Sequence, residues 1–274
     1  MRGMSGQPEL PLRPMTLGEL LDAAMVLLRR RALPLFASAA VLAGAEQLAL
    51  GPARAGADMT APFYGPAGGD VAAWWTVTAL GFGLEAGIIT LLAALAGAGA
   101  GAALLRPASK AGLFRHGRPW AALGAAVLVS LACAMAAYFT FLPWVFVYGL
   151  FGLAGPVLTI DRSRNSFTAL GRSAVLASRS GLRGCRILLA GYLTWFTIRF
   201  ALGAGWTEVI STVFGERPQW MSWLAPVAWA LADTIAYPAL ACIAAVLVLD
   251  IRIRTEGLDI AIRRAGPGQL VHVR

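Results

Sequence analysis

Four ionisable residues interrupt long apolar stretches of the sequence, and they are the side chains best placed to do chemistry. They are Glu46, Glu85, Arg199 and Asp233. At about 1.5 Å per helical residue, the last three would each lie roughly 17–20 Å from one end of their stretch, near mid-bilayer. Glu46 would lie somewhat closer to the outer side. Ionisable groups are costly in hydrocarbon and normally face protein or water.

Two interpretations of these residues remain open. The first is structural: Arg199 pairs with Glu85 or Asp233, or Arg199 and Glu46 extend towards the membrane surface. The second is functional, because buried ionisable groups also line the paths of protons and substrates in membrane proteins.

The stretches that hold these residues are long enough to be membrane-spanning helices. Hydrophobic residues make up 58% of the 274-residue chain and charged residues 14%, with a mean hydropathy of +0.68, whereas soluble domains average about 25% charged residues. A helix needs about 20 mostly apolar residues to cross a bilayer. We therefore expect an all-α integral membrane protein with a cytoplasmic segment (1–32), a six-span domain (33–250) and a basic cytoplasmic tail (251–274). The spans are expected at 33–50, 74–104, 119–139, 142–160, 187–205 and 222–249.

The basic residues predict the orientation of the chain. Of the 23 Lys and Arg residues, all except Arg54, Arg199 and Arg217 fall before the first expected span, after the sixth, or in the second and fourth connections. Basic residues concentrate in cytoplasmic loops, so both termini are expected in the cytoplasm, beside anionic lipid headgroups. The expected location is the cell membrane, which the chain crosses several times. An aromatic belt at the outer boundary is expected to contain Trp74, Trp75, Trp144, Trp206, Trp220 and Trp223.

Two amphipathic stretches are expected on the cytoplasmic side. Thr16 and Glu19 have the spacing of a capping box, and the following apolar residues recur at helical spacing. This helix is interpreted as lying on the inner leaflet; the alternative is an early extension of the first span. A second basic, partly helical stretch covers 165–184. The candidate cytoplasmic interaction face consists of Thr16, Glu19, Arg29, Arg172, Arg179, Arg183, Arg252 and Arg254.

The sequence argues against the common enzyme and nucleic-acid-binding classes. It has two His and three well-separated Cys, so neither a metal site nor another cofactor is expected. The stretch 96–102 fits G-x-G-x-x-A, but no acidic residue follows at the distance that a dinucleotide site needs. Close helix packing through Ala93, Gly97 and Gly101 is expected instead. Despite the net charge of +9, the chain has no basic domain with interleaved aromatic residues, so no nucleic-acid partner is expected.

Three motifs together resemble a known bacterial family. They are RPMTLGELLDAAMVLLRR at 13–30, ALGRSAVLASRS at 169–180 and LDIRIRTEGLDI at 249–260. The chain resembles the six-span family labelled as the membrane domain of glycerophosphoryl diester phosphodiesterase. The phosphodiesterase chemistry of that label belongs to a separate soluble barrel domain, and nothing of that size or composition occurs in this sequence.

The resemblance implies an integral membrane protein of unassigned role, with a membrane protein as its partner. The leading hypothesis is a non-enzymatic scaffold or subunit of a membrane complex. The alternative is a small transporter or permease-like component that uses Glu85, Arg199 and Asp233. A membrane-embedded enzyme of lipid metabolism is a third hypothesis, for which no residue set can be named.

Overall fold

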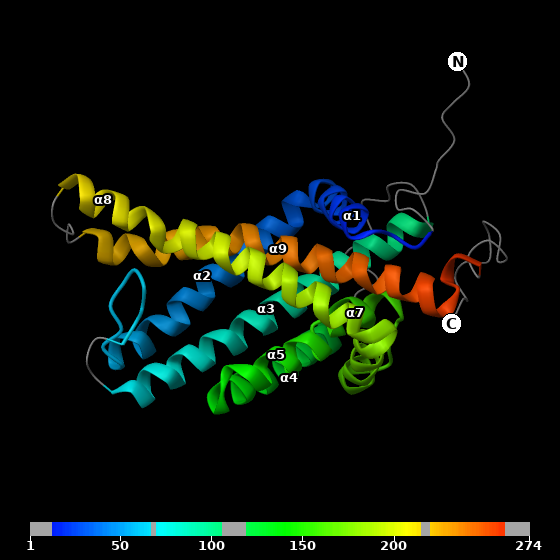
Figure 1. The fold of residues 1–274 in the computed structure, drawn as a ribbon, viewed down its shortest axis with the longest axis horizontal. Helices are drawn as coiled ribbons and strands as arrows, with labels where there is room; N and C mark the ends of the chain where they lie inside the picture. The colour runs from blue at the N-terminus through cyan, green and yellow to red at the C-terminus, as the bar shows by residue number, and fades with distance from the viewer. Residues whose placement is uncertain (1–12, 67–69, 106–118, 215–219, 261–274) are drawn as a thin grey trace, which may run out of the picture.

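The computed structural model describes residues 13–66, 70–105, 119–214 and 220–260, which fold as a bundle of helices (Figure 1). The described residues contain one isolated bridge, between Thr60 and Gly65, and no longer strand. A five-residue π-helical segment, Ala201–Gly205, joins α7 to α8. The α-helices are α1 (Leu17–Arg30), α2 (Ala32–Gly56), α3 (Val71–Leu105), α4 (Pro119–Phe139), α5 (Phe141–Phe151), α6 (Ala154–Ile160), α7 (Ser166–Phe200), α8 (Trp206–Phe214) and α9 (Trp220–Glu256).

Six helical stretches are long and apolar enough to cross a membrane, which confirms the predicted all-α, six-span class. They are Ala32–Gly56, Val71–Ala100, Pro119–Phe139, Phe141–Ile160, Ser166–Phe214 and Ser222–Glu256. The fourth is divided into α5 and α6, and the fifth combines α7, the π-helical segment and α8. In Figure 1, α1 and the C-terminal end of α9 lie towards one end of the long axis, and α8 lies towards the other.

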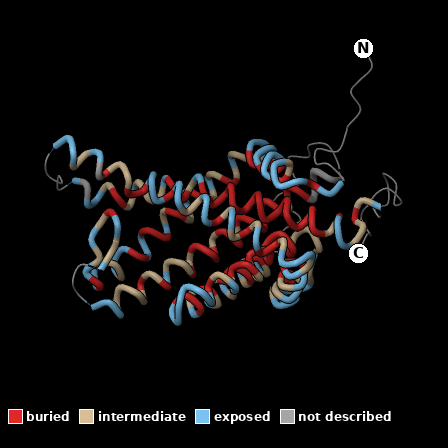
Figure 2. Tube along the Cα trace, in the orientation of Figure 1, coloured by how far each residue is buried: buried red, intermediate tan, exposed pale blue. Residues whose placement is uncertain are grey.

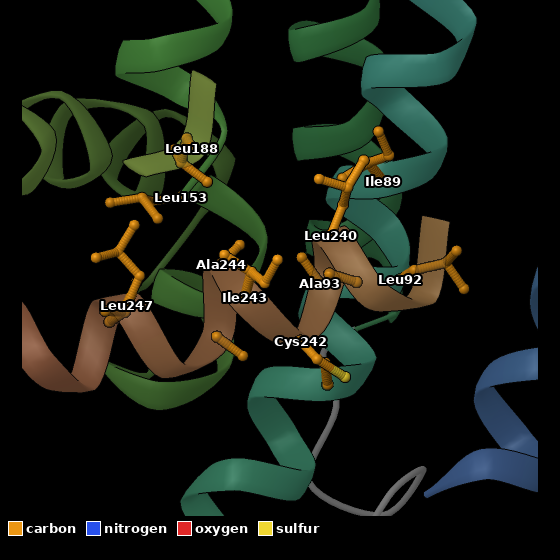
Figure 3. Close-up of a cluster of buried hydrophobic side chains, with 14 of the residues drawn as sticks. Ile89, Leu92, Ala93, Leu153, Leu188, Leu240, Cys242, Ile243, Ala244 and Leu247 are labelled. Atoms are coloured by element: carbon orange, nitrogen blue, oxygen red, sulfur yellow. The ribbon is translucent and has the colours of Figure 1, made fainter. Parts of the chain in front are cut away.

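The last span, α9, forms the centre of the bundle. Every residue from 236 to 251 is buried, and Figure 2 shows this continuous buried stretch. This stretch is enclosed by protein, because α9 contacts α1, α2, α3, α6 and α7. In Figure 3, Leu240 and Ile243 of α9 lie between Ile89 of α3 and Leu188 of α7. These five helices are therefore positioned by their contacts with α9.

Small residues bring α3 and α6 into backbone contact. A Cβ atom built on Gly97 would lie 2.8 Å from the Cα of Pro156, and one built on Gly155 would overlap the carbonyl oxygen of Thr90. Ala93 is fully buried. The expected close packing is thus confirmed for Ala93 and Gly97, since small residues let helix backbones approach in a membrane. The surroundings of Gly101 lie outside what the structure describes.

A Gly155→Ala substitution should therefore destabilise the protein more than the addition of one methyl group at an open position does. The new Cβ must displace the backbone of α3, and overpacking of this kind costs about 1–3 kcal/mol. Thermal unfolding in detergent measures the effect. Gly44→Ala is the matched control, because a Cβ at Gly44 has no neighbour within 4 Å. Equal effects of the two substitutions would contradict the backbone contact between α3 and α6.

The stretch expected at 165–184 is not one continuous helix. Arg179 to Leu182 have non-helical dihedral angles, with φ of 52° at Ser180, 66° at Gly181 and 61° at Leu182. The helix starts at a capping box made by Asn165 and Thr168, breaks at these residues and resumes. A Cβ on Gly184 would lie 2.9 Å from the Cα of Ala177, so the two arms of α7 touch beside the break. Left-handed conformations cost non-glycine residues about 1–2 kcal/mol each, and the packing around the break must offset that cost.

One member of the expected aromatic belt, Trp144, is buried within the bundle. Trp144 is only 1% exposed. Its ring stacks on Phe141 and on Tyr148, with centroids 5.0 and 5.3 Å apart. The Trp144 ring therefore faces other side chains of the bundle, beside the turn between α4 and α5.

Candidate functional site

The four ionisable residues singled out in the sequence meet inside the bundle. They join two further polar side chains in what we call the intramembrane cluster. Its members are all less than 10% exposed, and four helices supply them. They are Glu46 and Gln47 of α2, Glu85 of α3, Arg199 of α7, and Asp233 and Tyr237 of α9.

Arg199 occupies the centre of the intramembrane cluster. Its Nη1 donates a hydrogen bond to Oε1 of Glu85, and its Nε lies 2.6 Å from Oδ1 of Asp233. The second contact is an ion pair without the angles of a hydrogen bond. The guanidinium carbon also lies 5.0 Å from the centre of the Tyr237 ring. A planar guanidinium with five donors can serve two carboxylates at once, so both partners considered from the sequence are used.

Gln47 and Arg54 extend the polar contacts of the cluster towards the loop after α2. Nε2 of Gln47 donates to Oδ2 of Asp233 at 3.4 Å, and Nη1 of Arg54 donates to Oε1 of Gln47 at 2.6 Å. The guanidinium of Arg54 also stacks on the ring of Tyr64, 4.2 Å from its centre. A row of polar contacts thus connects Arg54 with Arg199.

Glu46 is held in a different way from the other two acids. Its Oε2 accepts a hydrogen bond of 2.7 Å from the hydroxyl of Tyr237. Tyr237 lies four residues after Asp233, on the same side of α9. Its ring carries the Arg199 contact and its hydroxyl carries the Glu46 contact. This pairing of Glu46 with a tyrosine could not be predicted from the sequence, from which Glu46 is expected to extend towards the membrane surface.

A row of aromatic rings runs beside the intramembrane cluster. Successive ring centroids lie 5.0–6.4 Å apart from Phe141 through α5 and along α7 to Phe200. Two donors in this row, Nε1 of Trp144 and the hydroxyl of Tyr192, are buried and have no hydrogen-bond partner among the described residues. Buried polar groups are normally paired, so these two donors are exceptions within the core.

A second polar group, the Met15 clasp, fixes the chain before α1 to the end of α9. Asp250, which is fully buried, accepts the backbone N–H of Met15 at 2.8 Å and Nε of Arg254 at 2.9 Å. Nε of Arg183 reaches the same carboxylate at 3.4 Å. Both arginines also donate to the carbonyl oxygen of Met15. The Met15 clasp consists of Met15, Arg183, Asp250 and Arg254.

A third group, the Glu256 cluster, ties the first arm of α7 to α9. Arg172 lies 2.6 Å from Oε2 of Glu256 and 3.0 Å from Oδ2 of Asp161. Arg179 lies 2.6 Å from Oε1 of Glu256, and Arg252 lies 2.6 Å from Oδ1 of Asp161. These five residues make up the cluster. Their side chains are 11–36% exposed.

Most residues of the candidate cytoplasmic interaction face are already engaged in contacts within the chain. Five of its arginines neutralise carboxylates of the same chain: Arg172, Arg179, Arg183, Arg252 and Arg254. The face is therefore largely an internal brace between α1, α7 and α9. Arg29, at the end of α1, is exposed.

Thr16 and Glu19 form the predicted capping box. The Thr16 hydroxyl accepts the N–H of Glu19 at 3.4 Å, and Oε2 of Glu19 accepts the N–H of Thr16 at 2.8 Å. This backbone hydrogen bond, followed by the contact with Arg13, lowers the pKa of Glu19 below its ordinary value. The box begins a helix with two apolar sides: Leu20 and Leu27 are buried, and Leu17, Leu21 and Met25 are 41–52% exposed.

The polar side chains of these three groups contact one another through ion pairs and hydrogen bonds. No three His, Cys, Asp or Glu residues among those described are grouped so that they could hold a metal ion. The cysteines Cys133, Cys185 and Cys242 are unpaired and buried. Comparison of the chain with protein-family models, with curated proteins and with solved structures finds no match.

Proposed function

We propose that this protein is a non-enzymatic multi-pass protein of the cell membrane that serves as a scaffold or subunit of a membrane complex. The observation that supports the proposal best is the use made of its charged groups. In the intramembrane cluster, the Met15 clasp and the Glu256 cluster, arginines neutralise carboxylates of the same chain. Such groups hold helices in register, which suits a structural role.

We propose further that both ends of the chain face the cytoplasm and that α1 lies on the inner leaflet. Leu17, Leu21 and Met25 recur every four residues on the exposed apolar side of α1, which suits contact with acyl chains. Arg29 at the end of the same helix would then face anionic headgroups. The resemblance of the three motifs to the six-span membrane domain agrees with this arrangement and with a role apart from catalysis.

Site-specific photo-cross-linking in native membranes tests the scaffold role. A photoreactive residue at Arg29 should give one discrete adduct with another membrane protein, which co-purifies with the unmodified chain in a fixed ratio. A photoreactive residue at Leu131 is the matched control, because that side chain is 59% exposed on the apolar surface of α4 and should capture lipid. If both positions yield only lipid adducts and the chain purifies alone, the scaffold role is wrong.

A second candidate function is that of a small transporter or permease-like component. It is favoured by one observation, the burial of Glu85, Arg199 and Asp233 together within the spans. Purified protein in liposomes with a trapped pH-sensitive dye tests its simplest form. A transporter driven by protons should dissipate an imposed pH gradient, and a Glu85→Gln/Asp233→Asn double variant should not. Equal rates for protein-containing and empty liposomes would count against it.

A further inference from the structure

We propose that Glu46 is a proton-binding site within the membrane, a carboxylic acid that carries its proton beside the Arg199 ion pairs. The inference goes beyond the scaffold role and does not depend on it. The intramembrane cluster contains three carboxyl groups, those of Glu46, Glu85 and Asp233, but its one cation is Arg199.

The groups around Glu46 come from four helices. Gln47 on α2 is neutral, Glu85 on α3 and Asp233 on α9 are acids, and Arg199 on α7 is the cation. These acids and Arg199 all act electrostatically on Glu46. The Tyr237 hydroxyl of α9 makes its direct hydrogen bond. Arg54 reaches the cluster through Gln47.

Arg199 is already shared by two carboxylates. Glu85 and Asp233 both lie within ion-pair distance of its guanidinium. An ionised Glu46 would therefore add a third negative charge close to two others, inside a bundle surrounded by lipid. Burying an uncompensated carboxylate is so costly that the group normally takes up a proton instead.

The hydroxyl of Tyr237 provides a hydrogen-bond partner for this carboxyl group. It lies 2.7 Å from Oε2 of Glu46, and the proton of the neutral acid is held in an O–H bond of the carboxyl group. Loss of the proton breaks this O–H bond and releases one H⁺, with no other change in bonding. The ligand of the site is thus the proton itself.

Infrared difference spectroscopy of the full-length protein in lipid nanodiscs tests the proposal. A protonated carboxylic acid has a carbonyl stretching band that is separate from the bands of carboxylates and amides. At neutral pH the wild-type protein should show this band, and it should shift on transfer to D₂O. In a Glu46→Gln variant the band should be lost, whereas in the control Asp22→Asn, which changes an exposed carboxyl group of α1, it should remain.

A second variant keeps the test valid if Glu46→Gln fails to fold. Tyr237→Phe leaves the carboxyl group in place and removes its hydrogen-bond donor. The same band should then move to higher frequency because the carbonyl has lost its donor. A wild-type spectrum that matches Glu46→Gln in this region, or a band that Tyr237→Phe leaves unmoved, would overturn the assignment to Glu46.

Discussion

Replacement of Arg199 by methionine should destabilise the protein by about 3–5 kcal/mol, the usual effect of removing one partner from a buried ion pair. The substitution leaves Glu85 and Asp233 as neighbouring carboxylates that have lost their shared cation. Arg199 and both acids are less than 10% exposed, so water cannot compensate for the lost contacts. Thermal unfolding in detergent, followed by the helical circular dichroism signal, measures the loss.

Two comparisons show whether charge compensation is the cause. The triple variant Arg199→Met/Glu85→Gln/Asp233→Asn removes the two acids as well, and should regain most of the lost stability. Arg186→Met removes an exposed arginine from the same helix and should change stability by less than about 0.5 kcal/mol. If the triple variant is no more stable than Arg199→Met, the role of Arg199 is packing rather than neutralisation.

The second large effect is expected at the Met15 clasp. Asp250→Asn should destabilise the protein by about 3 kcal/mol, because it removes a buried negative charge that faces Arg183 and Arg254. It also weakens the acceptor for the backbone N–H of Met15. The segment before α1 should therefore separate from α9. Hydrogen–deuterium exchange of the peptide that contains Met15 should become faster, while peptides of α4 keep their protection.

Asp22→Asn is the control for this experiment. Asp22 is exposed on α1, so its substitution should alter neither stability nor exchange near Met15. Uniformly faster exchange over the whole chain in Asp250→Asn would point to global destabilisation. That result would contradict a local clasp between the N-terminal segment and α9.

The span pattern could be predicted from the sequence because it depends on local composition. A run of apolar residues about 20 long specifies a membrane-crossing helix whatever its neighbours are. The third span, Pro119–Phe139, has the expected bounds. The pairing of Arg199 could be narrowed to Glu85 or Asp233 for a similar reason, since a buried arginine requires a carboxylate.

The neutral members of the intramembrane cluster could not be predicted in the same way. Gln47 and Tyr237 carry no charge that would mark a partner, and only the crossing of α2 with α9 brings them to Asp233 and Glu46. A weak signal was present: Tyr237 follows Asp233 by one helical turn, and Gln47 follows Glu46 directly.

The break in α7 and the carboxylate partners of its arginines could be identified only from the structure. In this turn of α7, Gly181 is the one residue of a type that commonly interrupts a helix. Ser180 and Leu182 adopt a positive φ as well. The sequence does not show which carboxylates the arginines there contact. Asp161, Asp250 and Glu256, which neutralise them, lie at distant span ends, and their convergence depends on the central position of α9.

We propose that six spans place both ends of the chain on the same side of the membrane and that the basic residues make this the cytoplasmic side. Cysteine labelling in intact cells tests this orientation most directly. The native cysteines are buried, so single cysteines can be introduced at the exposed positions Arg29, Thr60 and Thr140. A membrane-impermeant thiol reagent should label Thr60→Cys and Thr140→Cys in intact cells, and Arg29→Cys only after permeabilisation. Labelling of Arg29→Cys in intact cells, or protection of either threonine position, would contradict the account.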